Sequence, residues 1–242
     1  LTVSASVRAD AHPDAGVQLT ERVAVLARPV PGWSVRGSLG TGYTTPTGRT
    51  EETEATGLRG VRLTRALDPE QSVGAMIDVN GSAAGAELLL TAYGSTIADA
   101  VQLADVPGAI GYTVLQNASA RTRVGGVEAL AVWRFAGGKF IANYGYARGS
   151  RPDVVTGVRE GLPLLPRHRV GGDLMLERPG VYRIGIEGTW FGEQPLDDNP
   201  YRSTSKPYLY MMAIAARQFG PVELVANFEN LLNVRQTHTD PL

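Results

Sequence analysis

Hydrophobic and polar residues alternate along most of this chain with a period of two. In the segment Trp33–Tyr43, for example, Val35 and Leu39 fall on one face while Arg36 and Ser38 fall on the other. Successive side chains of a β-strand point to opposite faces, so this pattern predicts a strand with one apolar and one polar face. About eleven such segments follow one another, and the helical period dominates in none of them. The pattern therefore predicts an all-β fold.

The connections between the predicted strands fall into two groups. The short ones contain the glycine or proline that tight turns require: Pro29–Gly32, Asn80–Ser82, Ala136–Gly138, Arg178–Gly180 and Phe219–Pro221. The longer, polar ones are Asp10–Gly16, Thr44–Pro69, Ser95–Ile110, Arg148–Arg167 and Gly192–Lys206. If Tyr112–Phe135 is a single strand, short and long connections alternate. All long connections then lie at one end of an up-and-down sheet.

Strand length and aromatic positions favour a membrane barrel over a soluble antiparallel sandwich or barrel. The predicted strands have about ten residues, which is long for a sandwich and sufficient to cross the hydrocarbon of a bilayer when tilted. Aromatic residues lie near the ends of the apolar faces: Trp33 and Tyr43, Trp133 and Phe135, Tyr182 and Trp190. Aromatic girdles, short turns at one end and long loops at the other are typical of outer-membrane barrels. A soluble, sheet-rich binding protein is the competing interpretation.

Composition excludes several classes of function. The formal net charge of −1 over 242 residues gives no basic stripe, so no nucleic-acid partner is expected. The absence of cysteine excludes disulfide scaffolds and thiolate metal sites. His12, His168 and His238 have no i,i+4 partner, and no segment resembles a nucleophile elbow. Asp10, His12 and Asp14 could contact a cation, and composition alone leaves a Ser/His/Asp triad open. We expect no metal site and no cofactor, and the family resemblance described next implies no catalytic residues and a protein that is not an enzyme.

Several segments resemble motifs of TonB-dependent outer-membrane receptors. Gly37–Glu54 is similar to a strand and loop of that family through Gly42, Tyr43, Pro46 and Thr47, followed by acidic residues. Tyr112–Phe135 resembles another strand through Gln116, Asn117, Ala120, Gly126 and Glu128. Val225–Gln236 resembles the penultimate strand through Glu229, Asn230, Leu231, Leu232 and Asn233, and Pro163–Leu176 resembles a loop-to-strand entry through Pro166, Arg167 and His168. The order and spacing of these motifs cover most of the chain.

The resemblance implies an antiparallel up-and-down transmembrane β-barrel in the bacterial outer membrane. Residues 1–242 are then expected to be part of the barrel, about eleven strands from the second half of a 22-stranded barrel. The plug domain and the closing strand are expected to be absent from this chain. The implied function is active import of a scarce nutrient such as a ferric siderophore. The alternative is a passive outer-membrane porin or an outer-membrane β-barrel enzyme.

The resemblance also implies partners and site residues. The expected partners are the receptor's own plug domain, the TonB–ExbB–ExbD complex acting through that plug, outer-membrane lipid and a small-molecule substrate. Ligand contacts are expected in the extracellular loops, at Tyr43, Arg49, Glu51, Glu52, Glu54, Arg151, Asp153, Asp198, Tyr201 and Arg202. Charged strand residues are expected to face the lumen because a charge on the lipid face is costly. These are Arg36, Glu128, Arg134, Arg183, Glu187, Glu223 and Glu229.

Overall fold

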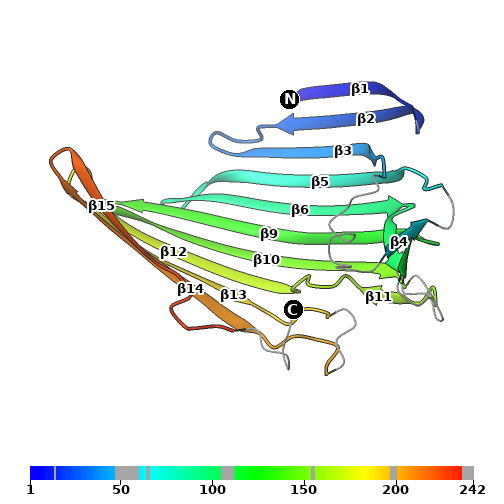
Figure 1. The fold of residues 1–242 in the computed structure, drawn as a ribbon. Helices are drawn as coiled ribbons and strands as arrows, with labels where there is room; N and C mark the ends of the chain where they lie inside the picture. The colour runs from blue at the N-terminus through cyan, green and yellow to red at the C-terminus, as the bar shows by residue number, and fades with distance from the viewer. Residues whose placement is uncertain are drawn as a thin grey trace.

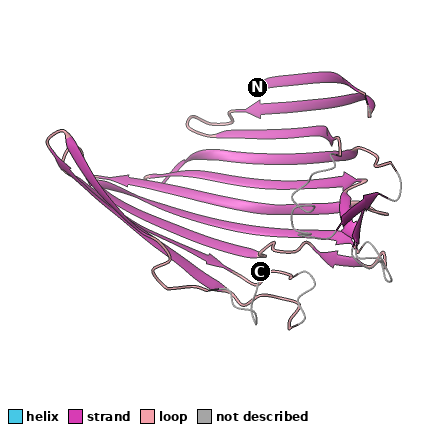
Figure 2. Cartoon of the chain, viewed as in Figure 1, coloured by secondary structure: helices cyan, strands magenta, loops and turns pink. Residues whose placement is uncertain are grey.

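The computed structural model describes residues 1–13, 15–46, 60–63, 66–104, 112–153, 156–196 and 201–235 (Figure 1). These residues consist of strands and their connections (Figure 2). The strands are β1 (Thr2–His12), β2 (Gly16–Ala27), β3 (Ser34–Thr44), β4 (Gly60–Leu63), β5 (Glu70–Ala83), β6 (Ala86–Ala98), β7 (Val101–Ala104), β8 (Tyr112–Asn117), β9 (Thr122–Phe135), β10 (Gly138–Pro152), β11 (Arg159–Gly161), β12 (His168–Arg178), β13 (Tyr182–Phe191), β14 (Tyr208–Phe219) and β15 (Val222–Phe228). Within these ranges no helix is long and apolar enough to cross a membrane.

Most of these strands form one antiparallel main sheet. Its order is β1-β2-β3-β5-β6-β9-β10-β12-β13-β14-β15, and β11 pairs with β10 beside this path. Each strand on the path pairs with its neighbour in the opposite direction, and the sheet curves strongly toward β14 and β15 (Figure 1). The predicted all-β, antiparallel, up-and-down architecture of about eleven strands is confirmed.

A second, three-stranded sheet was not expected from the sequence. In this small sheet β8 pairs with β4 in parallel and with β7 in antiparallel orientation. The prediction of one strand over Tyr112–Phe135 is wrong, because β8 belongs to the small sheet and β9 to the main sheet. The Asn117 side chain at the end of β8 accepts a hydrogen bond from the Asp68 amide and donates to the carbonyls of Asp68 and Asp99, which fastens β8 beside β5 and β6. We call the end of the main sheet that carries the small sheet the loop end, and the opposite end the turn end (Figure 1).

The turn between β5 and β6 lies later in the chain than predicted. The prediction of a turn at Asn80–Ser82 is wrong, since these residues are part of β5. The turn is Ala84-Gly85, and both residues have positive φ, 51° and 75°. Two positive φ values are what a tight type I′ hairpin requires. Gly81 has a different role: a Cβ there would lie 2.3 Å from the Trp33 ring, so the missing side chain makes room for the indole.

The first predicted long connection is also short in the structure. β1 extends to His12 and β2 begins at Gly16, and these two residues are cross-strand partners. The prediction of a polar loop over Asp10–Gly16 is therefore wrong. The polar residues of this segment continue the strand alternation, and Gly16 with φ 66° allows the chain to reverse within a few residues. The remaining long connections do lie at the loop end.

The segment after β15 forms a turn that is fastened to β14. The Asn230 side chain accepts a hydrogen bond from the Val234 amide (2.8 Å) and donates one to the Val234 carbonyl (3.0 Å). The Leu231 amide donates to the Met211 carbonyl at 2.9 Å. Asn230 and Asn233 both have φ 50°, a conformation that asparagine tolerates better than most residues. This local chemistry explains why alternation stops after Phe228.

The register gives the main sheet a polar face and an apolar face. Directly opposed residues on neighbouring strands share a face, and one such row runs through Arg36, Asp78, Thr91, Glu128, Gly145 and Arg169. This side is the polar face. The opposite, apolar face leaves Leu39, Ile77 and Leu90 about half exposed, at 56%, 49% and 52%. The fully buried leucine of the described residues is Leu115, in the small sheet.

Aromatic side chains of the apolar face gather near both ends of the strands. At the turn end Trp133 stacks on Phe140 with ring centroids 5.8 Å apart. At the loop end the Tyr144 hydroxyl lies 2.9 Å from Nδ1 of His168, and the Tyr146 ring is 5.2 Å from the His168 ring. The apolar band between these aromatics is exposed to whatever surrounds the sheet.

Candidate functional site

The connections at the loop end are joined into one layer by backbone hydrogen bonds. The Leu164 amide donates to the Pro195 carbonyl at 2.8 Å, and the Arg167 amide donates to the Glu193 carbonyl at 3.3 Å. The connection that follows β11 is therefore attached to the connection that follows β13. The loop end is a structured surface and not a set of independent loops in the part of the chain described.

Asn117 fixes the small sheet to the main sheet. Its side chain is buried, at 5% exposure. Its Oδ1 accepts a hydrogen bond from the Asp68 amide (2.9 Å), and its Nδ2 donates to the carbonyls of Asp68 (2.9 Å) and Asp99 (2.7 Å). The residue thus ties the start of β5 and the end of β6 to the end of β8. Burial without these partners would leave three backbone groups and an amide unsatisfied.

Glu70 supports the same junction. Its carboxylate accepts a hydrogen bond of 2.6 Å from the Val101 amide at the start of β7. The apolar residues of the small sheet pack beneath these polar contacts, with Val114 at 4% and Leu115 at 1% exposure. The small sheet therefore has a core of its own beside the ends of β5 and β6.

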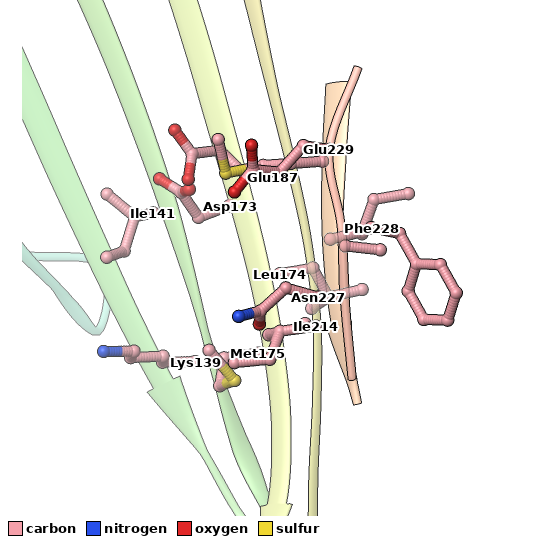
Figure 3. A pocket seen from close by; sticks show the side chains of 14 residues that line it. Lys139, Ile141, Asp173, Leu174, Met175, Glu187, Ile214, Asn227, Phe228 and Glu229 are labelled. Carbon is pink, nitrogen blue, oxygen red and sulfur yellow. The ribbon is translucent and has the colours of Figure 1, made fainter. Parts of the chain in front are cut away.

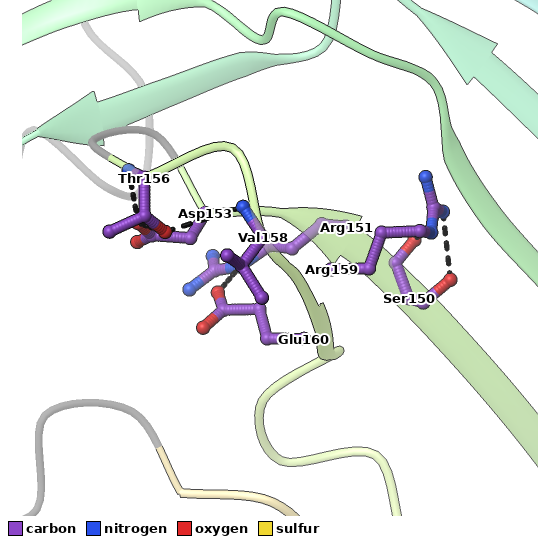
Figure 4. A network of polar contacts seen from close by, with 7 residues as sticks. All are labelled: Ser150, Arg151, Asp153, Thr156, Val158, Arg159 and Glu160. Atoms are coloured by element: carbon purple, nitrogen blue, oxygen red, sulfur yellow. Dashed lines mark hydrogen bonds and ion pairs between the residues drawn. The ribbon is translucent and has the colours of Figure 1, made fainter.

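Two of the predicted ligand residues, Arg151 and Asp153, take part in contacts of the β10–β11 hairpin (Figure 4). Arg151 Nε donates to Glu160 Oε1 at 2.7 Å. Asp153 Oδ1 accepts hydrogen bonds from the amide (2.7 Å) and the hydroxyl (2.5 Å) of Thr156. These contacts hold the hairpin in shape, so a ligand reaching either residue competes with an existing partner.

The predicted residues Tyr201 and Arg202 lie in the connection between β13 and β14. Tyr201 is 62% exposed, and Arg202 is half-buried. Beside them the Leu196 amide donates to the Ser203 carbonyl, and the Ser205 amide donates to the Gln194 carbonyl, both at 2.9 Å. Tyr201 is therefore presented on an ordered support at the loop end.

Tyr43 has a different surrounding from these residues. It is the penultimate residue of β3 and pairs with Gln71, which places it on the apolar face near the loop end. Tyr43 shares the apolar face with the aromatic residues Tyr144 and Tyr146, whereas Arg151 and Tyr201 lie in or beside the connections of the loop end. The other predicted ligand residues, Arg49, Glu51, Glu52, Glu54 and Asp198, lie outside the described residues.

The polar face carries charges that pair across strands. Arg36 donates from Nε (3.0 Å) and Nη2 (2.9 Å) to Asp78 Oδ2, and the Thr91 hydroxyl donates to Asp78 Oδ1 at 2.9 Å. Nearer the turn end, Arg134 Nη1 lies 2.7 Å from Glu87 Oε1. Each of these four charged side chains has a partner on a neighbouring strand.

The residues predicted to face the lumen occupy this same face in the register. They are Arg36, Glu128, Arg134, Arg183, Glu187 and Glu223. Glu229 follows β15, but it lines a cavity together with Glu187 and Asn227. That this face lines a lumen is a prediction that we take up below.

A cavity of about 510 Å³ lies on the polar face of β10, β12, β13, β14 and β15 (Figure 3). The carboxylates of Asp173, Glu187 and Glu229 lie together on one side of it, and the Lys139 amine lies on the other. Among the described residues, no group of three or more histidine, cysteine, aspartate or glutamate side chains is arranged to hold a metal ion. The cavity is an acidic hollow in the curved part of the sheet.

The sequence did not indicate Asp78, Glu87, Lys139, Asp173 or Glu160 as candidate site residues. All five occupy strand positions. Alternation does not predict the register between strands. The register pairs Asp78 with Arg36 and Asp173 with Glu187. The role of Asn117 in joining the two sheets was not predicted either, although Asn117 lies in a segment that resembles a motif of the receptor family.

Comparison with known proteins assigns the chain to a family. A sequence profile described as "TonB dependent receptor-like, beta-barrel" matches residues 1–231. No curated protein sequence matches the chain.

Solved structures show the same fold at low sequence identity. The siderophore receptor PirA from Acinetobacter baumannii has a TM-score of 0.74 and 14% identity, over 97% of this chain and 40% of the receptor. A mutant of the ferric enterobactin receptor PfeA from Pseudomonas aeruginosa, in complex with enterobactin, has a TM-score of 0.74 and 16% identity, over 98% and 38%. The copper transporter OprC has a TM-score of 0.70 and 16% identity, over 89% and 34%. The chain thus spans 40% or less of each of these proteins.

Proposed function

Because this chain belongs to the TonB-dependent receptor β-barrel family, whose members are outer-membrane transporters and not enzymes, we propose that it forms part of an active importer. The imported substrate is a scarce nutrient, and a ferric siderophore is the proposed cargo. Residues 1–242 act as barrel wall, and the missing part of the barrel and a plug domain complete the receptor.

The two-faced main sheet is the observation that supports this function most directly. An exposed apolar face with aromatics near both ends suits a sheet that contacts lipid. The opposite face carries charged pairs between β3 and β5 and between β6 and β9, which suits a lumen that holds water or a plug. We therefore propose that Arg36, Glu128, Arg134, Arg183, Glu187, Glu223 and Glu229 face the lumen.

The side chains at the loop end support the proposed cargo. Arg151 and Arg202 offer guanidinium groups, Tyr201 offers an exposed aromatic ring, and Asp153 offers a carboxylate. Cationic and aromatic side chains suit a large, anionic metal chelate, with which arginine forms charge-assisted hydrogen bonds. The names of the matched proteins refer to a siderophore, to enterobactin and to copper, and this supports a metal chelate as the class of cargo. Arg49, Glu51, Glu52, Glu54 and Asp198 complete the proposed set, and Tyr43, which lies on the apolar face, is left out of it.

Import against a gradient requires partners outside this chain. We place the plug domain against the polar face, where the acidic cavity around Glu187 offers a docking surface for basic or hydrogen-bond-donating groups. The TonB–ExbB–ExbD complex supplies the energy by acting on the plug. The chain itself makes no covalent bond with the substrate, so binding and release depend on contacts at the loop end.

Uptake measurements test the function and separate it from a passive porin. A strain lacking the receptor gene is complemented with the full-length receptor, and uptake of radiolabelled ferric enterobactin is followed with and without a protonophore. We expect complemented cells to take up the chelate and to lose uptake when the inner membrane is de-energised. Uptake that persists without energy would indicate a porin. No uptake in energised cells, with the receptor present in the outer membrane, would exclude this cargo.

A further inference from the structure

Two arginines lie on the apolar face at its turn end. Arg178, the last residue of β12, pairs with Tyr182 of β13, and Tyr182 pairs with Arg217 of β14. The three side chains therefore form one row across the sheet, with the tyrosine between the two arginines. All three are exposed. A charge on the apolar side of a membrane sheet is costly within the hydrocarbon, so the position of this row calls for an explanation.

The backbone holds the two arginines in a fixed relation. The Val181 amide donates a hydrogen bond to the Arg178 carbonyl at 2.9 Å, and the Val181 carbonyl accepts one from the Gln218 amide at 3.0 Å. Val181 thus connects the turn after β12 to the end of β14. The Arg217 guanidinium lies 5.8 Å from the centroid of the Phe219 ring, which shares its face. This cation–π contact keeps the charge of Arg217 on the apolar side of the sheet.

No carboxylate balances the charge of these arginines on their own face. Within the described ranges, neither Arg178 nor Arg217 forms an ion pair. The acidic residues of strands β12 to β15 all occupy polar-face positions, and they are Asp173, Glu177, Glu187 and Glu223. The two guanidinium groups therefore complement an anionic group that approaches from the lipid side.

A hollow lies beside this row on the apolar face of β13, β14 and β15. Its volume is about 400 Å³, and Tyr182 and Arg217 both line it. Two small side chains that face each other across the strands, Ala215 and Ala226, also line it. The flanking side chains of Ile184 and Leu224 are larger and are 52% and 61% exposed. The hollow therefore offers an apolar depression with a guanidinium at its turn end.

The arginine row lies at the edge of the apolar band. Ile184 and Ala215, which pair with each other, are two residues nearer the middle of the sheet than the row, a distance of about 7 Å along a strand. Beyond the row the chain turns at Gly180 and Gly220, both with positive φ. Tyrosine is enriched where hydrocarbon gives way to headgroups, and Tyr182 occupies such a position. The two arginines are therefore at the height of the phosphate groups of the leaflet at the turn end.

We propose that Arg178, Tyr182 and Arg217 bind the phosphate of one anionic phospholipid of the periplasmic leaflet, and that an acyl chain of this lipid lies in the hollow over Ala215 and Ala226. The proposal rests on the proposed function for the orientation of the sheet, with its turn end in the periplasmic leaflet and its apolar face in lipid. Arginine binds phosphate oxygens by bidentate, charge-assisted hydrogen bonds. A lipid bound to the folded wall in this way stabilises strands β12 to β15.

Native mass spectrometry of the full-length receptor in detergent tests the headgroup site, with dioleoylphosphatidylglycerol as the probe. The double variant Arg178→Ala/Arg217→Ala is expected to bind this lipid about 30-fold more weakly, from the loss of two charges at the membrane surface. The matched control is Arg183→Ala, which removes an arginine from the polar face next to Tyr182 and should leave lipid binding unchanged. Dioleoylphosphatidylcholine has the same chains and no net charge. It should bind to the unmodified receptor as weakly as dioleoylphosphatidylglycerol binds to the double variant.

A second variant tests the hollow without changing any charge. Ala215→Phe fills the depression and should weaken binding of dioleoylphosphatidylglycerol about 10-fold, because roughly two methylene groups of the acyl chain lose their contact. Ala142→Phe is the matched control, since it makes the same change on the apolar face of β10, outside the hollow, and should leave binding unchanged. Heat-modifiable migration on gels establishes first that each variant is folded.

Several results would overturn the proposal. Unchanged binding in the double variant, an equal loss in Arg183→Ala, or equal binding of the two lipids would exclude the headgroup site. Displacement of the lipid by millimolar inorganic phosphate would indicate a site for the free ion. Unchanged binding in Ala215→Phe, or an equal loss in Ala142→Phe, would exclude the acyl chain from the hollow. If the double variant does not fold, the single variants Arg178→Ala and Arg217→Ala give the same test.

Import of ferric enterobactin by the full-length receptor is measured in parallel, so that this inference and the proposed function can fail separately. A receptor that imports the chelate but shows no preference for dioleoylphosphatidylglycerol contradicts the lipid site alone. A receptor that shows this preference, with the expected losses in the variants, but imports no chelate contradicts the proposed cargo alone.

Discussion

The small sheet and the main sheet place their hydrophobic residues in opposite environments. Leu115 in the small sheet is 1% exposed, and its neighbours Val114 and Ala104 are also buried. In the main sheet Leu39 and Leu90 are more than half exposed, while charged pairs such as Arg36 and Asp78 occupy the other face. The small sheet is organised like the core of a soluble protein. The main sheet needs an apolar surrounding, and lipid supplies it.

This difference shows that apolar side chains of one chain can be buried by protein in one sheet and left for lipid to cover in the other. Exposed apolar side chains usually signal an interaction surface when they form a large patch. Here they cover one whole face of a curved sheet, and their number and order follow the strands. The small sheet, by contrast, buries its own apolar residues and is joined by hydrogen bonds to the ends of β5 and β6. Three substitutions test the contrast.

The largest effect is expected from placing a charge on the apolar face. Leu39→Arg loses roughly 1.5–3 kcal/mol of leucine burial in lipid and adds about 2–4 kcal/mol for arginine near the midplane of the bilayer. We expect the receptor to fail to assemble in the outer membrane, as measured by heat-modifiable migration on gels of membrane fractions. Ser38→Arg introduces the same side chain one residue earlier on the polar face and should assemble normally. Equal loss in both variants would contradict the assignment of faces.

A smaller and more local effect is expected from shortening a buried leucine. Leu115→Ala should destabilise the small sheet by about 2–5 kcal/mol, because it leaves a cavity that neighbouring side chains fill only in part. The matched change in the main sheet is Leu90→Ala, where lipid chains can occupy the vacated space. Hydrogen exchange of residues 112–117 in the folded receptor measures the first, and thermal unfolding in lipid measures the second. If both variants lose the same stability, the two sheets do not differ as described.

The smallest effect is expected where the two sheets meet. Asn117→Ala removes three hydrogen bonds to the backbone of Asp68 and Asp99 and should cost about 1–3 kcal/mol. We expect faster hydrogen exchange at the start of β5 and in β7, with assembly of the main sheet unchanged. Asn230→Ala is the control, since it breaks a comparable pair of bonds that stays within its own turn. Loss of barrel assembly in Asn117→Ala would show that the main sheet depends on the junction.

Most of the main sheet could be predicted from local pattern. The alternation at Val35 and Arg36 already assigned both residues to their faces, and the same held for strands up to β15. The errors arose where a residue had a role that alternation does not reveal. Gly81 resembled a turn glycine, but it makes room for Trp33. The run Tyr112–Asn117 resembled the beginning of β9, but β8 is buried on both faces in the small sheet.

The candidate site was less predictable than the fold. Arg151 and Tyr201 were expected at the loop end, and the structure adds the supports that hold them. The partner of Arg151 lies in β11, a strand of three residues that has no pattern of its own.

The sequence alone identifies this chain as a series of two-faced strands and assigns most side chains of the main sheet to a face. It can do so because alternation is a local property of extended backbone. Which charges pair and where the second sheet forms depend on the tertiary structure. These outcomes depend on residues far apart in the chain, such as Arg36 and Asp78 or Asn117 and Asp68. Register over such separations is set by turns and by packing against neighbouring strands, and neither can be read from one strand alone.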